Sequence, residues 1–182
     1  MENVELIVRS SELIEGKKNS ELKTRNSKLH KRMNCFILLW ATGFGVGYSP
    51  VAPGTMGTLL AIPIYFFLST IPFPLYELTL VTFFFLSSWI SENAEKYFGR
   101  RDDPRIVIDE VMGFCITMLW VPRTALFIVM GFILFRFFDI LKPFPIRRLE
   151  KVWKGGFGVV LDDVAAGIYA NIILHLIHLI SG

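Results

Sequence analysis

The sequence predicts an all-α protein, a compact bundle of about five to six short apolar helices that is embedded in a membrane or associated with one. Apolar residue types make up 53% of the 182 residues and charged types only 19%, against about 25% charged in an ordinary soluble domain. The charges are unevenly placed, because no Asp, Glu, Lys or Arg occurs between residues 35 and 76. A helix in water normally carries a charged face, so a bilayer is the simplest solvent for such segments.

Proline-rich turns divide the apolar sequence into helices. The turns are expected at 71–74 and at 121–123. The expected helices are 34–47, which is interfacial or partly buried, 58–68, 78–90 with a polar continuation to Lys96, 111–120, 124–141, and a last helix with its N-cap at Asp162/Asp163 that runs to Ile180. A straight membrane span needs about 20 residues, so most of these helices either span with tilt and bilayer thinning or only dip into the membrane.

The basic residues predict which connections share a side of the membrane. Lys and Arg gather in 92–110 and in 142–162, and basic loops stay on the cytoplasmic side. The loop at 48–56 is then cytoplasmic as well. The turns at 71–77 and 121–123 lie on the opposite side, together with the C-terminus.

The first 32 residues differ in kind from the rest of the chain. They hold eight Lys/Arg, five Glu and no aromatic residue, so they carry the whole net charge of +3. This composition predicts a flexible basic tail that either contacts anionic lipid headgroups or has no role. Neither a secretory signal nor a transit peptide is expected. Residues 33–182 are predicted to form a single helical domain.

Acidic residues stand beside apolar segments at three places. Asp109 and Glu110 precede one uncharged helix, Asp162 and Asp163 precede another, and Asp139 lies near the end of a third. Carboxylates next to hydrocarbon are costly unless they are paired or bind a metal. Carboxylates from three loops or helix ends suit an oxygen-ligand Mg²⁺ site for phosphate chemistry. Zinc is disfavoured, because no Cys or His stands near them.

Cations and hydroxyls accompany these acids. Arg136 and Lys142 can meet phosphate, as can Arg147 and Arg148. A simpler reading makes Arg136, Asp139 and Lys142 a local ion-pair ladder on one helix face. The loop at 47–58 leads into a helix and can turn backbone N–H groups and the hydroxyls of Ser49, Thr55 and Thr58 towards an anion.

Other features exclude competing chemistries. The sequence lacks the Gly-Lys-Ser/Thr ending of a nucleotide P-loop and the dinucleotide fingerprint, so neither a nucleotide cofactor nor a nucleic-acid partner is expected. Cys35 and Cys115 are predicted to be packing residues. His175 and His178 are predicted to have a structural or interfacial role.

Taken together, the motifs resemble the phosphatidylglycerophosphatase A family. The matching stretches are 48–58 (YSPVAPGTMGT), 108–113 (IDEVMG), 135–147 (FRFFDILKPFPIR) and 155–163 (GGFGVVLDD). The resemblance runs from about Ala41 to Ala170. It implies Mg²⁺-dependent hydrolysis of phosphatidylglycerophosphate to phosphatidylglycerol and inorganic phosphate. It also implies the bacterial inner membrane, with the active site facing the cytoplasm.

The same resemblance implies roles for individual residues. The implied catalytic and metal-binding acids are Asp109, Glu110, Asp139, Asp162 and Asp163, and the implied phosphate-binding residues are Arg136, Lys142, Ser49, Gly54 and Thr55. Which carboxylates bind metal and which position water is left open. Water is the favoured nucleophile, because no Ser or Cys stands beside a credible base. The oligomeric state is not predicted.

Two alternatives are kept. One is a non-catalytic membrane scaffold or transporter subunit, in which the eleven acids and eleven bases outside the tail form structural ion pairs. The other keeps the metal site but transfers a phosphoalcohol between lipids. It is disfavoured, because the Asp-Gly and Ala-Arg signature of such transferases is absent.

Overall fold

A computed structural model describes residues 32–144, 146, 153 and 155–181. This part of the chain contains helices and turns but no strand, which confirms the all-α prediction. The chain divides into the units Met1–Phe36 and Ile37–Gly182, and the helical bundle belongs to the second unit. The predicted basic tail lies outside the described residues, apart from Arg32.

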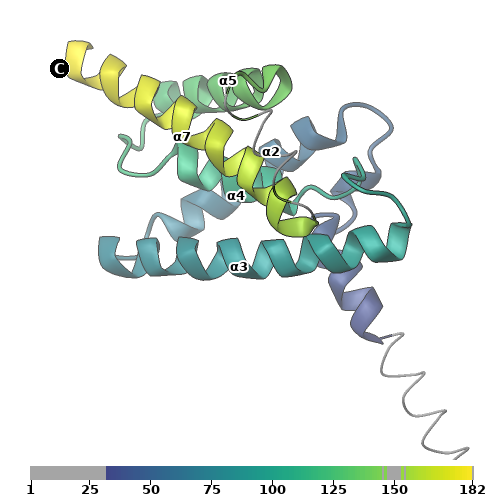
Figure 1. The fold of residues 1–182 in the computed structure, drawn as a ribbon. Helices are drawn as coiled ribbons and strands as arrows, with labels where there is room; N and C mark the ends of the chain where they lie inside the picture. Colours follow the sequence, from purple (N-terminus) through teal and green to yellow (C-terminus); the bar gives the residue numbers. More distant parts are fainter. Residues whose placement is uncertain (1–31, 145, 147–152, 154, 182) are drawn as a thin grey trace, which may run out of the picture. The chain divides into compact units, whose positions relative to one another are not determined.

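The elements follow the predicted order (Figure 1). They are a helix at Arg32–Ala41, the 3₁₀ helix η1 (Val46–Tyr48), α2 (Pro53–Leu68), α3 (Phe73–Phe98), α4 (Ile108–Thr117), α5 (Ala125–Leu141) and α7 (Gly156–Ser181). Several bounds differ from the predicted ones. Pro74 was expected in the turn at 71–74. It instead lies in the first turn of α3, where a missing N–H costs nothing.

The start of α7 corrects a second expectation. Asp162 and Asp163 do not cap this helix but lie in its second turn, because the helix begins at Gly156. The reason is packing against α3: a Cβ at Gly156 would collide with backbone atoms of Ser88 and Glu92. Because glycine has no Cβ, it allows this close contact, which stabilises the part of the helix that precedes Asp162.

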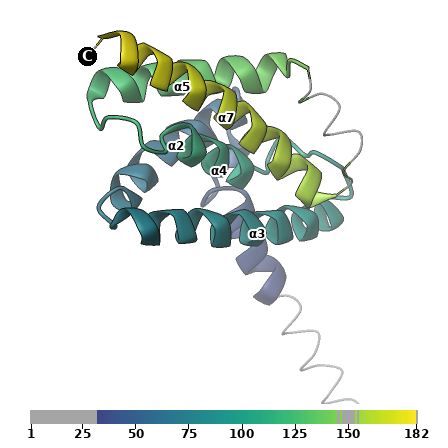
Figure 2. The ribbon, with the colours of Figure 1, turned by 60° about the vertical axis from the view of Figure 1, so that its left-hand side comes forward.

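The short helix α4, of ten residues, occupies the centre of the bundle. Figures 1 and 2 both show it between α3 and α5, with α7 crossing it. Most of its ten residues are buried, among them Asp109. The crossing with α7 is close, since a Cβ at Gly167 would collide with the carbonyl oxygen of Gly113.

The two ends of the bundle carry different groups. Both predicted turns meet at one end, where Ile71, Phe73, Val121 and Arg123 line a cavity of about 340 Å³. The first turns of α2 and α4, the end of α5 and the early part of α7 meet at the other end. The loops are therefore grouped as the charge distribution predicts.

Two helices are long and apolar enough to cross a membrane, α3 and the stretch Gly156–Ile180 of α7. Only 28% of the apolar window in α3 is buried. Large apolar side chains such as Phe85 and Leu179 are exposed, and apolar surface on this scale marks a membrane or partner contact. The described fold is that of a membrane protein in which α4, about 15 Å long, is too short to span.

Candidate active site

A polar cleft of about 290 Å³ opens at the end of the bundle where α2, α4, α5 and α7 meet. Its lining is dominated by acids. The described acids are Asp102, Asp103, Asp109, Glu110, Asp139, Asp162 and Asp163, and the described bases are Arg136 and Lys142. All five acids predicted from the sequence therefore lie in one cleft together with Arg136 and Lys142. The other two predicted cations, Arg147 and Arg148, lie outside the described residues.

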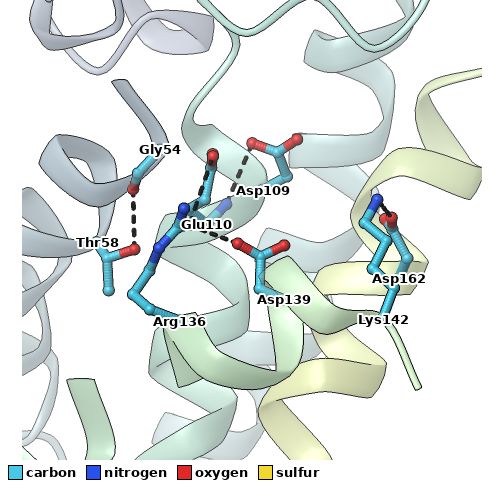
Figure 3. Close-up of polar contacts among 8 residues, drawn as sticks. All are labelled: Gly54, Thr58, Asp109, Glu110, Arg136, Asp139, Lys142 and Asp162. Carbon is cyan, nitrogen blue, oxygen red and sulfur yellow. Dashed lines mark hydrogen bonds and ion pairs between the residues drawn. The ribbon is translucent and has the colours of Figure 1, made fainter. Parts of the chain in front are cut away.

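Three of the carboxylates form a compact group. One oxygen each of Asp109, Glu110 and Asp163 lies within 4.8 Å of the others. Asp109 and Asp163 are each 5% exposed. The backbone N–H of Glu110 donates to Asp109 Oδ1 at 3.1 Å (Figure 3). Mutual repulsion in so small a space requires protons or a cation.

The acids on α4 have shifted proton affinities. Burial, followed by the charge of Glu110, raises the pKa of Asp109 well above its ordinary value. Burial raises the pKa of Glu110 to about 8, and the charge of Asp163 contributes in the same direction. A hydrogen bond with Asp109 and the charge of Arg136 oppose that rise. Without a bound cation, Glu110 therefore keeps its proton well above pH 4.5, and burial favours the protonated form of Asp109 as well.

The group fits a divalent cation with oxygen ligands. Glu110 Oε2 is buried and has no hydrogen-bond partner among the described residues. A buried acceptor in that state costs free energy, and a bound cation removes the cost. Three carboxylates also supply the hard oxygen donors that Mg²⁺ prefers.

The remaining two predicted acids each pair with a base (Figure 3). Arg136 Nη1 lies 2.5 Å from Asp139 Oδ2 and 4.0 Å from Glu110 Oε1. Lys142 Nζ contacts Asp162 Oδ2 on α7. The ladder reading is thus correct only for Arg136 and Asp139. Lys142 adopts a left-handed conformation (φ 42°) where α5 ends, and its side chain reaches across to α7.

Of the predicted loop residues, Gly54 alone lines the cleft. A Cβ there would collide with Glu110 Oε1 and lie 3.1 Å from Arg136 Nη1, so glycine lets both side chains keep these positions. Its carbonyl accepts a hydrogen bond from Thr58 Oγ1 at 2.9 Å. Ser49 instead donates to Val51 O at 3.0 Å, and neither Ser49 nor Thr55 is among the described lining residues.

Two acids of the cleft were not predicted as site residues. Asp103 is buried and forms a two-pronged ion pair with Arg105, at 2.7 and 2.8 Å, which lowers the pKa of Asp103. The backbone N–H of Asp102 donates to Glu95 Oε1 at 2.6 Å. The signal was present in the sequence, because this pair repeats the acidic doublet at 162–163.

His175, His178, Cys35 and Cys115 are not among the described residues that line the cleft. His175 Nε2 is 3.1 Å from Leu119 O, and the ring of His178 packs on Phe127. These contacts agree with the predicted structural or interfacial role. Cys115 is buried and Cys35 is exposed, so the predicted packing role is confirmed only for Cys115.

Comparison with known proteins identifies the family. The phosphatidylglycerophosphatase A family profile matches residues 39–178. The chain is 37% identical to a phosphatidylglycerophosphatase A of Escherichia coli over 140 residues, covering 76% of this chain and 81% of the relative. It is 38% identical to a phosphatidylglycerophosphatase A of Haemophilus influenzae over 143 residues, covering 78% and 88%.

A third relative carries a different name. A Bacteroides thetaiotaomicron protein, provisionally named a phosphatidylinositol-3-phosphatase, is 40% identical over 163 residues, covering 84% of this chain and 99% of the relative. No solved structure matches the chain. The family profile spans most of the chain and includes the whole cleft, so the chain belongs to the phosphatidylglycerophosphatase A family of phosphatases.

Proposed function

We propose that this membrane phosphatase hydrolyses phosphatidylglycerophosphate to phosphatidylglycerol and inorganic phosphate, with Mg²⁺ as cofactor. The observation that carries the proposal is the three-carboxylate group of Asp109, Glu110 and Asp163 beside Arg136, at one end of an apolar bundle. The names of the Escherichia coli and Haemophilus influenzae relatives support the choice of substrate.

The geometry supports different roles for the five predicted acids. Asp109, Glu110 and Asp163 would hold the metal, which when bound neutralises phosphate charge and makes water more nucleophilic. Asp139 would orient Arg136, with which it is paired at 2.5 Å. Asp162 would orient Lys142 in the same way.

Arg136 is the main phosphate ligand in this proposal. Its Nε is buried and donates to none of the described residues, so the guanidinium has a donor to offer a phosphate oxygen. Planar guanidinium groups bind phosphate through paired hydrogen bonds. The first turn of α2, which contains Gly54, adds the partial positive charge of a helix N-terminus.

The nucleophile in this proposal is water. No Ser, Thr, Cys or His is among the described residues that line the cleft, so a hydroxyl, thiol or imidazole nucleophile is missing there. Carboxylates can also act as nucleophiles, but this proposal assigns the five predicted acids to the metal, to Arg136 and to Lys142. Water attack forms a new P–O bond while the bond from phosphorus to the glycerol oxygen breaks. Arg136 would stabilise the negative charge on the phosphoryl oxygens during this step.

The site is proposed to face the cytoplasm from a bacterial inner membrane. The described basic residues Lys96, Arg100, Arg101 and Arg105 lie at the end of α3 or in the loop that enters the cleft. Basic loops remain on the cytoplasmic side. Activity on sealed inverted vesicles, but not on right-side-out vesicles supplied with external substrate, is the expected result.

A phosphatidylinositol 3-phosphate substrate is a second candidate. It is favoured by the Bacteroides relative, which aligns over 99% of its own length. Both lipids carry a phosphate monoester, so the same metal and arginine would serve either substrate. The two candidates differ in the alcohol that leaves.

Phosphate release from a panel of lipid phosphomonoesters tests these proposals. The purified protein in detergent is supplied with phosphatidylglycerophosphate, phosphatidylinositol 3-phosphate or phosphatidic acid, with Mg²⁺ or with EDTA. We expect Mg²⁺-dependent release with the highest kcat/KM on phosphatidylglycerophosphate. A higher kcat/KM on the inositol lipid would replace the first candidate by the second. No release from any lipid would refute both.

A further inference from the structure

An apolar groove of about 740 Å³ lies beside α4. One wall is formed by residues 63–68 of α2 and the other by residues 78–86 of α3. Its floor contains Ile108 and Val111 of α4, which are both buried. The groove therefore lies between the two helices that precede α4 in the chain.

The groove offers a ligand only apolar contact. No charged residue is among its described lining residues, and Thr79 and Thr82 supply its only hydroxyls. Each hydroxyl donates to a carbonyl of its own helix, at 2.7 Å for Thr79 and 2.8 Å for Thr82. Because both donors are already satisfied, neither hydroxyl has a free donor to offer a polar ligand.

The dimensions and position of the groove fit a lipid acyl chain. Residues 78–86 extend about 12 Å along α3, close to the roughly 15 Å depth of one leaflet of a bilayer with a hydrocarbon core of about 30 Å. Trp40 and Phe44 complete the lining. They lie next to the start of α4, where the N–H of Val107 donates to Ala41 O at 2.8 Å. Trp side chains such as Trp40 favour the headgroup level of a membrane.

One turn of helix joins the groove to the cleft. Ile108 and Val111 line the groove, whereas Asp109 and Glu110, between them in sequence, line the cleft. We propose that the groove binds an acyl chain of the same phospholipid whose terminal phosphate is held by Arg136 and the carboxylate group. The headgroup would then pass around the first turn of α4. This inference rests on the proposed lipid phosphatase activity and adds a specificity site for the acyl chain.

A substitution that fills the groove with a larger side chain tests the proposal by enzyme kinetics. Thr82→Phe places a ring in the middle of the α3 wall, and Val81→Phe is the matched control, because Val81 is exposed and lies outside the described lining. Phosphatidylglycerophosphates with short and long acyl chains are compared in mixed micelles. We expect wild type and Val81→Phe to favour long chains equally, and Thr82→Phe to reduce the ratio of long-chain to short-chain kcat/KM at least tenfold. An unchanged ratio in Thr82→Phe would overturn the proposal.

Photolabelling provides a readout that does not need turnover. A phosphatidylglycerophosphate with a diazirine on one acyl chain is irradiated with the full-length protein in EDTA, and the labelled peptides are identified by mass spectrometry. We expect label on 78–86, reduced at least fivefold by excess unlabelled phosphatidylglycerophosphate but not by phosphatidylcholine. Equal competition by both lipids would show bulk lipid in the groove, and absence of label on 78–86 would show that no acyl chain of this lipid reaches the groove. Either result overturns the proposal.

The two experiments separate this inference from the proposed function. If wild type releases no phosphate from any lipid, the proposed function fails. If wild type is active but the acyl-chain ratio and the label do not respond, only the groove assignment fails.

Discussion

Gly113 on α4 and Gly167 on α7 face each other where the two helices cross, each four residues after an aspartate of the cleft, Asp109 and Asp163 respectively. Residues four apart lie on the same face of a helix. The glycine contact therefore sets the distance at which the two aspartates meet, one turn away. A pair of residues without side chains determines the geometry of the most acidic part of the cleft.

Widening this crossing should weaken the metal site. A Cβ at Gly167 would collide with Gly113 O and lie 3.3 Å from Ile116 Cβ, so Gly167→Ala must push α7 away from α4. Overpacking of this kind costs about 1–3 kcal/mol. We expect a lower melting temperature and a higher Mg²⁺ concentration for half-maximal activity. The control is Gly131→Ala, whose Cβ meets chiefly the flexible Met118 side chain at 2.7 Å; an equal change in Mg²⁺ requirement there would contradict the argument.

Removing a single carboxylate of the group should abolish activity. Asp163→Asn and Glu110→Gln keep the shape of each side chain but remove its charge. Loss of a supporting residue around a metal typically costs 10- to 100-fold, so loss of a ligand should cost at least about 100-fold in kcat/KM. Phosphate release is measured alongside circular dichroism, which must show wild-type helix content. Full activity in both folded variants would refute the site.

The pKa of Glu110 makes the stability of the metal-free protein depend on pH. Because this pKa is about 8 in the fold and 4.5 ordinarily, the folded state binds more protons than the unfolded state between these values. The free energy of unfolding should therefore fall as pH rises from about 4.5 to about 8. Metal needs the deprotonated acid, so Mg²⁺ should raise the melting temperature more at pH 8.5 than at pH 6.

Glu110→Gln isolates this effect from the other titrating groups. Without metal at pH 8.5, the variant should melt at a higher temperature than wild type, because its neutral amide avoids the cost of burying a charge and is not repelled by Asp163. At pH 5 the two proteins should differ little. If the melting temperatures of wild type and Glu110→Gln change in parallel across pH 5–8.5, Glu110 titrates near its ordinary pKa.

The sequence predicted the elements well where packing and local signals agree. Uncharged runs and prolines located α2, α4 and α5 to within a few residues, because apolar helices in this chain end where polar or rigid residues begin. The predicted start of α7, with its N-cap at Asp162, was wrong, because the helix begins at Gly156. Its first turn depends on Gly156 lying against the backbone of α3, a contact between segments far apart in sequence that no local pattern contains.

The site was predicted as a set of residues but not as an arrangement. The distribution of charges in the sequence predicted that the five acids lie at one end of the bundle, and the structure places all five in one cleft. Sequence alone could not distinguish the group of three from the two that pair with Arg136 and Lys142, because Lys142 leaves the helix and reaches α7. Asp102 and Asp103 were missed as site residues, since the turn that brings them to the cleft depends on Glu95, seven residues before Asp102.

Arg136 should require its planar guanidinium. Arg136→Lys keeps the charge but loses the forked donors, and a charge-assisted hydrogen bond contributes about 1.5–3 kcal/mol. We expect kcat/KM to fall about tenfold to a hundredfold. Arg123→Lys, at the opposite end of the bundle, serves as the control and should behave as wild type. Similar losses in both variants would indicate a general effect of the substitution and not phosphate binding.

Glu95 should act by positioning the loop that carries Asp102 into the cleft. Glu95 is buried, and its Oε1 accepts the N–H of Asp102, which has the left-handed φ of 49°. Glu95→Gln retains an oxygen acceptor, whereas Glu95→Ala leaves the strained turn without its hydrogen bond. We expect Glu95→Ala to lower kcat/KM about tenfold, the lower end for supporting residues of a metal site, and Glu95→Gln to stay close to wild type.

The matched control is Glu92→Ala, because Glu92 pairs with Lys96 at an exposed position on the same helix, where ion pairs contribute little. If Glu95→Ala and Glu92→Ala have the same kcat/KM, the hydrogen bond to Asp102 does not position the cleft.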